Sequence, residues 1–280
     1  MMTSRTVRPA PARPVRAVPP AVKRPGLAGT LRSEFTKLRS VRSTYFTLIA
    51  FFLAGAGFAI AAAAGNRANG GQALFDPTAT SLQGAVHLGE LIIVVIGALV
   101  ITSEYGTRMI STSLTAMPRR GVLYVAKAVV LTCVTSAVAL ITSLASFFAG
   151  QAVLGAGHGG ASIASPDALR SVLLSAVFVT CCALLAFGLG AVIRYTAGAV
   201  TTLFGLVFLI PLLGQALPTN WFHEIERWLP GGGALGPIIA TKPVPDAAYL
   251  FGPYGELAVF AGYAAIALIA GFLLFRRRDA

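Results

Sequence analysis

Six apolar stretches, each long enough to cross a lipid bilayer as a helix, constrain this 280-residue chain more than any other feature. A hydrocarbon core of about 30 Å takes about 20 helical residues. The stretches cover residues 45–64, 84–102, 123–153, 168–193, 197–214 and 255–275. They are continuously apolar, whereas the strands of a membrane barrel alternate between apolar and polar residues. We therefore predict an all-α integral membrane protein with six transmembrane helices.

The charge pattern predicts the orientation of these helices. Only 11% of residues are charged, against roughly a quarter in soluble domains. The formal charge of +12 would suggest nucleic acid as a partner in a soluble protein. Here, if the N-terminus is cytoplasmic, 18 of the 22 Lys and Arg residues lie on the cytoplasmic side. We therefore expect both termini in the cytoplasm and no nucleic-acid partner. The Ala-rich, Gly-rich, Arg-over-Lys composition is typical of a GC-rich bacterium, and we expect the chain to lie in a bacterial cytoplasmic membrane.

Two segments precede the first stretch. Residues 1–26 hold six of the sixteen prolines, which disfavour helix and sheet, so we predict a disordered cytoplasmic tail. Residues 27–44 have an apolar stripe at helical spacing and many basic residues, which predicts an amphipathic helix at the membrane interface. We assign to this interfacial helix Leu27, Leu31, Glu34, Phe35 and Leu38. The pattern fits a lipid anchor and a partner-binding helix equally.

The segment 103–121, "SEYGTRMISTSLTAMPRRG", separates the second and third stretches on the predicted cytoplasmic side. Ile110, Leu114 and Met117 repeat at helical spacing, and Pro118 ends the pattern. The opposite side carries uncharged hydroxyl residues, which favours a groove on another protein over a lipid surface. Packing beneath the neighbouring transmembrane helices is the alternative. The third stretch is longer than the bilayer requires, so its start is expected to project into water, with Lys127 snorkelling.

This arrangement resembles the membrane subunit of an ABC-2 type transporter. The resemblance rests on the interfacial helix before the first stretch, the order of six stretches, and matching residues around the cytoplasmic segment: Glu104, Tyr105, Gly106, Thr107, Pro118, Arg119, Arg120 and Lys127. It extends over residues 27–280. It implies that residues 106–118 form a coupling helix, which docks on a separate ATP-binding cassette subunit. It also implies a homodimer or heterodimer of membrane subunits that exports lipids, drugs, peptides or glycans.

The chain shows no sequence motif of an enzyme. It has no GxxxxGK[ST] phosphate-binding loop, no HExxH, no CxxC and no GxSxG. We therefore predict no catalytic residue, no metal site and no cofactor bound by this chain; ATP and Mg²⁺ would be bound by the partner subunit that the resemblance implies. The three cysteines, Cys133, Cys181 and Cys182, lie in apolar stretches and are predicted to be core thiols.

An acidic residue inside the second stretch is a candidate for the substrate route. Glu90 and His87 are three residues apart and are expected to share a helical face. Ionisable groups inside a membrane usually face a bundle interior or a cavity, so we hypothesise that Glu90, with His87, lines the substrate route or the dimer seam. If the helix begins later, Glu90 lies instead at the level of the lipid headgroups.

Residues 219–230 predict a short helix at the outer membrane interface. Trp221, Ile225 and Trp228 repeat at helical spacing, and Pro230 ends the pattern. Tryptophans concentrate at membrane interfaces, so the helix is either an aromatic anchor or, with Trp221 and Trp228, a lateral gate for an amphipathic substrate.

Two other classes of protein fit less of the sequence. A secondary transporter commonly shows inverted repeats, and no half-to-half similarity is visible. A non-transporting membrane protein, such as a sensor anchor or an immunity factor, would not need the apolar stripe at Ile110, Leu114 and Met117. We therefore favour the permease subunit of an ABC-2 type exporter, working with a separate ATP-binding subunit.

Overall fold

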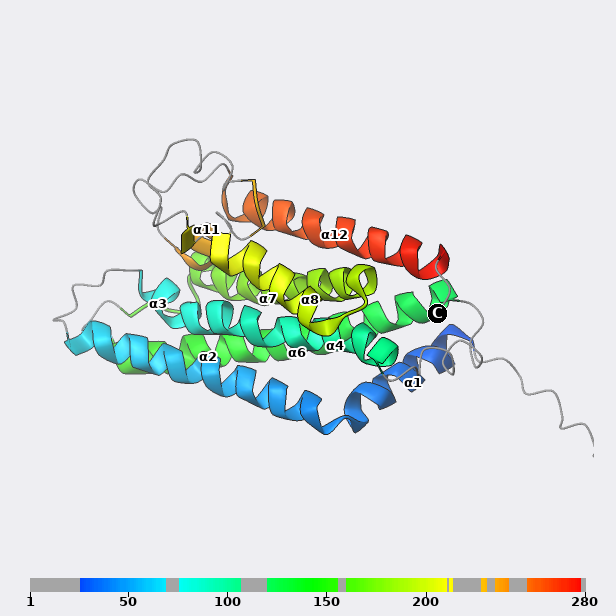
Figure 1. Cartoon of the computed structure of the whole chain (residues 1–280). Coiled ribbons are helices and arrows are strands. Elements are labelled where there is room, and N and C mark those ends of the chain that lie inside the picture. Colours follow the sequence, from blue (N-terminus) through cyan, green and yellow to red (C-terminus); the bar gives the residue numbers. More distant parts are fainter. Residues whose placement is uncertain are drawn as a thin grey trace, which may run out of the picture.

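The computed structural model describes residues 26–68, 76–106, 120–155, 160–210, 212–213, 228–230, 235–241 and 251–277. Within these ranges all regular elements are helices, as the continuously apolar stretches predict. Figure 1 shows the long helices lying side by side in a bundle, with the short helix α1 (Leu27–Ser40) at one end. The predicted disordered tail, residues 1–26, lies outside the described residues except for its last residue.

Five helices of the described chain are long and apolar enough to cross a membrane. They are α2 (Arg42–Ala68), the continuous helix Pro77–Gly106, α6 (Arg120–Leu154), α7 (Pro166–Ile193) and α12 (Pro253–Arg277). The helix Pro77–Gly106 comprises α3 (Pro77–Gln83), a π-helical turn η1 (Gly84–Leu88) and α4 (Gly89–Gly106). These five helices correspond to the first, second, third, fourth and sixth predicted stretches.

The described part of the fifth predicted stretch is also helical. It contains α8 (Thr196–Phe204) and the π-helical turn η3 (Gly205–Leu209). At 1.5 Å per residue the helix Thr196–Leu209 is about 20 Å long, and Ile210, Leu212 and Leu213 beyond it are helical as well, with residue 211 outside the described residues. Figure 1 shows α8 running from near the end of α7 toward the end of the bundle where α11 (Leu235–Ile239) lies. Only two residues join α7 to α8, and Arg194 has a left-handed φ of 61°, so the predicted tight turn is present.

The helix α7 lies at the centre of the bundle and packs against α4, α6 and α12. Small residues allow close approach. A Cβ atom added to Gly97 of α4 would lie 2.3 Å from the carbonyl oxygen of Ala183 in α7. Cys181 and Cys182 are buried free thiols in α7, as predicted. Cys133 is exposed instead, so its assignment as a core thiol was wrong: it lies on the outer face of α6.

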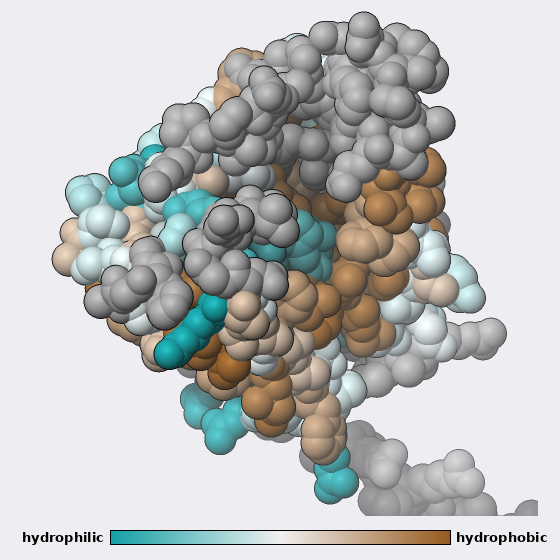
Figure 2. All heavy atoms as spheres, turned by 90° about the vertical axis from the view of Figure 1, so that its left-hand side faces the viewer, coloured by the Kyte–Doolittle hydropathy of each residue, from teal (hydrophilic) through white to brown (hydrophobic). Residues whose placement is uncertain are grey.

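The outside of the bundle is apolar. Phe46 and Leu53 of α2 are 71% and 62% exposed, and Ile266 of α12 is 66% exposed. Figure 2 looks at the end of the bundle that is on the left in Figure 1, and hydrophobic residues there gather on one flank. Such exposed side chains are unfavourable in water and favourable in lipid, which agrees with a multi-pass membrane protein.

Figure 1 shows α1 and the last turn of α12 at the same end of the bundle. The end of α4 and the start of α6 lie there too, and they flank the segment 103–121. The helices nearest the two ends of the chain, α1 and α12, therefore meet at one end of the bundle, whereas residues 1–25 and 278–280 lie outside the described residues. We call this end the predicted cytoplasmic end.

Candidate functional site

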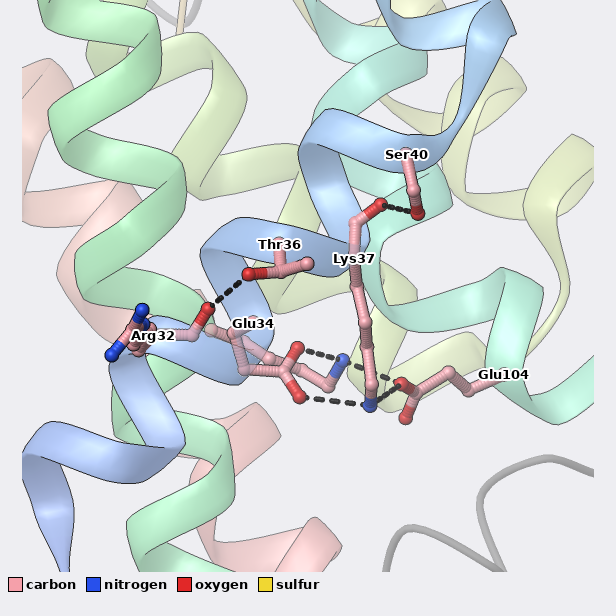
Figure 3. Close-up of polar contacts among 7 residues, drawn as sticks. Arg32, Glu34, Thr36, Lys37, Ser40 and Glu104 are labelled. Carbon is pink, nitrogen blue, oxygen red and sulfur yellow. Dashed lines mark hydrogen bonds and ion pairs between the residues drawn. The ribbon is translucent and has the colours of Figure 1, made fainter.

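Four charged side chains meet at the predicted cytoplasmic end of the bundle. Lys127 Nζ lies 2.6 Å from Glu34 Oε2 and 2.7 Å from Glu104 Oε1. Lys37 Nζ contacts the same two carboxylates, at 2.9 Å from Glu34 Oε1 and 3.1 Å from Glu104 Oε1. Figure 3 shows the two carboxylates facing one another, with the ammonium groups between them. We call Glu34, Lys37, Glu104 and Lys127 the charge cluster.

The charge cluster joins three helices that are distant in sequence. Glu34 and Lys37 are one helical turn apart on α1, Glu104 lies in the last turn of α4, and Lys127 lies in the second turn of α6. Glu104 opens the predicted coupling segment 103–121, and α6 begins where that segment ends. The cluster therefore connects the interfacial helix to both flanks of the predicted docking segment.

Burial and charge balance define the electrostatics of the cluster. Lys127 is only 3% exposed, so water does not solvate its ammonium group. The two carboxylates provide the hydrogen bonds and opposite charge that water would otherwise provide. Two acids and two bases make the cluster neutral. Burial lowers the pKa of Lys37, but hydrogen bonds to Glu34 and Glu104 and their negative charges outweigh burial, so its pKa is raised above the ordinary value. Each of the four groups hydrogen-bonds to both groups of opposite charge in the cluster.

The position of Lys127 corrects one expectation. We predicted that it snorkels to water from the start of the third stretch, whereas it is buried and ion-paired. The sequence shows a lone base near the end of an apolar stretch, and its partners lie on other helices. Glu34, whose Oε2 atom lies 2.6 Å from Lys127 Nζ, was predicted only as a residue of the interfacial helix, and Lys37 was not predicted as a site residue. Glu34 and Lys37 are three residues apart, and this spacing was the signal that they share a helical face.

The helix α1 turns a polar side toward the bundle. Thr30 and Glu34 are buried, whereas Leu27 and Phe35 of the apolar stripe are 54% and 49% exposed. Two further stripe residues, Leu31 and Leu38, are half-buried. The exposed stripe is therefore available to lipid, as expected for an interfacial helix, and Glu34 is a contact to α4 and α6 instead of part of that stripe.

The predicted coupling segment is described only at its two ends. Glu104 is buried, Tyr105 is half-buried and Gly106 ends α4. The guanidinium of Arg194 lies 4.9 Å from the centre of the Tyr105 ring, which ties the end of α4 to the turn between α7 and α8. Arg120 begins α6. The remaining predicted docking residues, Thr107, Ile110, Leu114, Met117, Pro118 and Arg119, lie outside the described residues.

Glu90 lies inside the bundle. It is 2% exposed and lies near the middle of the helix Pro77–Gly106. Its Oε2 atom has no hydrogen-bond partner among the described residues. A cavity of about 20 Å³ beside it is lined by residues of α4, α7, α8 and η3, including Cys182, Phe204 and Phe208. This volume is enough for about one water molecule.

His87 does not join Glu90 in this structure. Its Nδ1 atom lies 3.1 Å from the carbonyl oxygen of Gln83, and the described contacts hold no His87–Glu90 pair. His87 belongs to the π-helical turn η1, whose wider winding changes the faces that residues three apart occupy. The expected joint role of His87 and Glu90 in the substrate route stays a prediction.

The predicted outer helix 219–230 is described only from residue 228 onward. Residues 228–230 form a turn, so the predicted helix does not extend to its expected end. Trp228 is 54% exposed, its ring centre lies 6.1 Å from that of Phe251, and its carbonyl oxygen accepts a hydrogen bond from the Tyr263 hydroxyl. These contacts are with Tyr263 of α12 and with Phe251, which lies two residues before α12, and none of the three residues lines the Glu90 cavity. Trp221 lies outside the described residues.

Comparison with known proteins agrees with the architecture. A family model described as "ABC-2 family transporter protein" matches residues 30–212, which is more than half of the chain and contains the whole charge cluster and Glu90. No curated protein matches the chain. The helical bundle, the five bilayer-length helices and this match lead to one assignment. The chain belongs to the ABC-2 family of transporter proteins and is a multi-pass membrane subunit.

Proposed function

We propose that this chain is the permease subunit of an ATP-driven exporter in a bacterial cytoplasmic membrane. Members of the ABC-2 family normally work with an ATP-binding subunit. In this proposal two permease subunits, identical or paralogous, surround the substrate route, and the partner subunits bind ATP and Mg²⁺. The substrate is an amphipathic molecule such as a lipid, drug or peptide.

The charge cluster is the observation that carries the mechanism. The ATP-binding subunit docks on residues 103–121. Glu104 lies near the start of this segment, in the last turn of α4. Because Glu104 and Glu34 share the ammonium of Lys127 at 2.7 and 2.6 Å, a displacement of the docking segment moves α1 and α6 with it. Buried charges resist separation, since an unpaired ion inside the bundle is costly. Closure of the ATP-binding subunits would thus tilt the helices toward an outward-facing arrangement.

Glu90 is the proposed substrate-facing acid in this mechanism. Its buried carboxyl group, one oxygen of which has no hydrogen-bond partner among the described residues, lies beside a small cavity between α4, α7 and α8. Intramembrane acids usually serve a transport route, because lipid provides nothing to stabilise them. Helix tilting that enlarges this cavity would expose Glu90 to the substrate.

Co-purification in mild detergent tests the docking step. The chain is expected to retain an ATP-binding subunit, and Leu114→Asp is expected to release it while membrane insertion stays intact. Thr112→Asp is the matched control, because it adds the same charge on the opposite side of the predicted helix. Equal retention by both variants, or full transport in vesicles without nucleotide, would contradict the proposal.

A further inference from the structure

Two contacts fasten the start of α8 to the end of α4. The guanidinium carbon of Arg194, in the turn before α8, lies 4.9 Å from the centre of the Tyr105 ring. The hydroxyl of Thr196, the first residue of α8, lies 2.7 Å from that of Thr102. Because the Thr102 hydroxyl donates to the Ala98 carbonyl oxygen, it accepts this bond from Thr196. The start of α8 is therefore held at the last turns of α4, where the docking segment begins.

The backbone at Arg194 has a conformation that favours glycine. Arg194 follows α7 with a left-handed φ of 61°, and its N–H donates to the Gly190 carbonyl oxygen at 2.8 Å. Glycine is the usual residue at such a helix end, because a Cβ atom disfavours this conformation. Among the described residues, Arg194 is the only non-glycine residue with a positive φ. The contact of its guanidinium with Tyr105 accounts for an arginine at this position, which the turn by itself does not.

The helix formed by α8 and η3 provides one wall of the cavity beside Glu90. Its buried residues, Ala199, Leu203 and Val207, repeat at intervals of four and form one face. Leu203 and Val207 line the cavity from this face, and Glu90 of α4 and Cys182 of α7 line it from the other two helices. Among the described elements α8 packs chiefly against α4 and α7, and residues on its other side are exposed. A displacement of α8 away from these helices would therefore open the cavity.

We propose that Arg194 is a positioning residue that transmits movement of the docking segment to α8 and so to the Glu90 cavity. By its contact with Tyr105, Arg194 makes the start of α8 follow the end of α4. At 1.5 Å per residue, Glu90 lies about 18 Å along α4 from Thr102, so a stiff helix has to carry the displacement. Packed side chains and rigid helices are the usual carriers of such coupling. The inference rests on the proposed function for the source of the movement.

Reaction of the Cys182 thiol with methyl methanethiosulfonate reports how far α8 opens. Cys182 is fully buried and lines the cavity, so its reaction rate follows the population of the locally opened state. The assay uses the full chain in nanodiscs, with Cys133 and Cys181 replaced by alanine, and follows the reaction by intact-mass spectrometry. Arg194→Gly keeps the left-handed turn and removes the guanidinium. It is expected to raise the rate about threefold to thirtyfold, which corresponds to the strength of a partly desolvated cation–π contact.

Four further variants separate the contact from the turn. Arg277→Gly is the matched control, because it removes an exposed arginine from the same end of the bundle, and it should leave the rate unchanged. Tyr105→Leu should raise the rate as Arg194→Gly does, whereas Tyr105→Phe keeps the ring and should react at the wild-type rate. The double variant of Arg194→Gly and Tyr105→Leu should show no further increase, because both changes remove one contact. Increases that multiply in the double variant, or a wild-type rate for Arg194→Gly, would overturn the proposal.

Trapped nucleotide tests the transmission of movement. With the co-purified ATP-binding subunit held in its closed state by ADP and vanadate, the Cys182 rate of the chain with Arg194 should rise. In Arg194→Gly the rate should no longer respond to nucleotide, which a merely structural role of Arg194 would not cause. A response of equal size in both proteins, or none in either, would overturn the proposal. The rate without nucleotide is measured on the chain alone, so it tests the contact even if no ATP-binding subunit co-purifies and the exporter proposal fails.

Discussion

Replacement of Lys127 by Met isolates the contribution of the charge cluster. Methionine keeps the apolar stem and approximate length of lysine but removes the ammonium. The variant loses contacts of 2.6 and 2.7 Å to Glu34 and Glu104 and leaves two buried carboxylates with Lys37 as their described basic partner. Breaking a buried ion pair costs about 3–5 kcal/mol. Because Lys37 still neutralises one carboxylate, we expect a loss of about 3 kcal/mol in the free energy of unfolding.

Lys37→Met is the matched control for this variant. Lys37 contacts the same two carboxylates, but its side chain is 40% exposed, against 3% for Lys127. Water screens the Lys37 pairs, and exposed ion pairs contribute about 0.2–1 kcal/mol. The two substitutions remove the same charge from the same cluster, so the difference between them reports burial alone.

The assay is reversible unfolding of the purified chain in mixed micelles, followed by helical circular dichroism. A double-mutant cycle with Glu34→Gln separates the Lys127–Glu34 contact from the other effects of each substitution, and a coupling free energy of about 1–3 kcal/mol is expected. A loss for Lys127→Met that is no greater than the loss for Lys37→Met would refute the reasoning. So would a coupling free energy near zero.

Three other substitutions test separate parts of the structure. Gly97→Ala should destabilise the bundle by about 1–3 kcal/mol in the same unfolding assay, because the added Cβ atom would lie 2.3 Å from a carbonyl oxygen of α7. Gly57→Ala is the control: a Cβ atom at Gly57 would lie in open space, so this variant should be neutral or stabilising. Asp76→Ala should lower the free energy of unfolding by about 1.5–3 kcal/mol in that assay, because Asp76 Oδ2 accepts hydrogen bonds from the backbone N–H and the hydroxyl of Thr241, both at 2.8 Å. An unchanged free energy of unfolding would show that this contact is dispensable. Glu90→Gln should preserve or raise stability, because it replaces a buried ionisable carboxyl group by a neutral amide of the same size. It should alter substrate export in vesicles, and unchanged export would exclude Glu90 from the substrate route.

The sequence alone determined the helical, membrane-spanning character of the chain. A bilayer-length apolar stretch forms a helix in lipid because every backbone polar group must be satisfied within the segment, and this requires no knowledge of other helices. Five of the six predicted stretches appear as helices of sufficient length, and α1 and its exposed stripe follow the amphipathic pattern. The family resemblance was also contained in local motifs, and the match over residues 30–212 confirms it.

Only the tertiary structure decided which charges meet. Lys127 is joined to Glu34 across 93 positions of sequence and to Glu104 across 23, so no local spacing could show that it is buried and paired and does not snorkel. The π-helical turn Gly84–Leu88, which contains His87, was likewise not visible in the apolar pattern. Apolar burial is encoded within each stretch, whereas the partner of a buried ion comes from whichever helix packs beside it. The environment of Lys127 therefore depends on the packing of α1, α4 and α6.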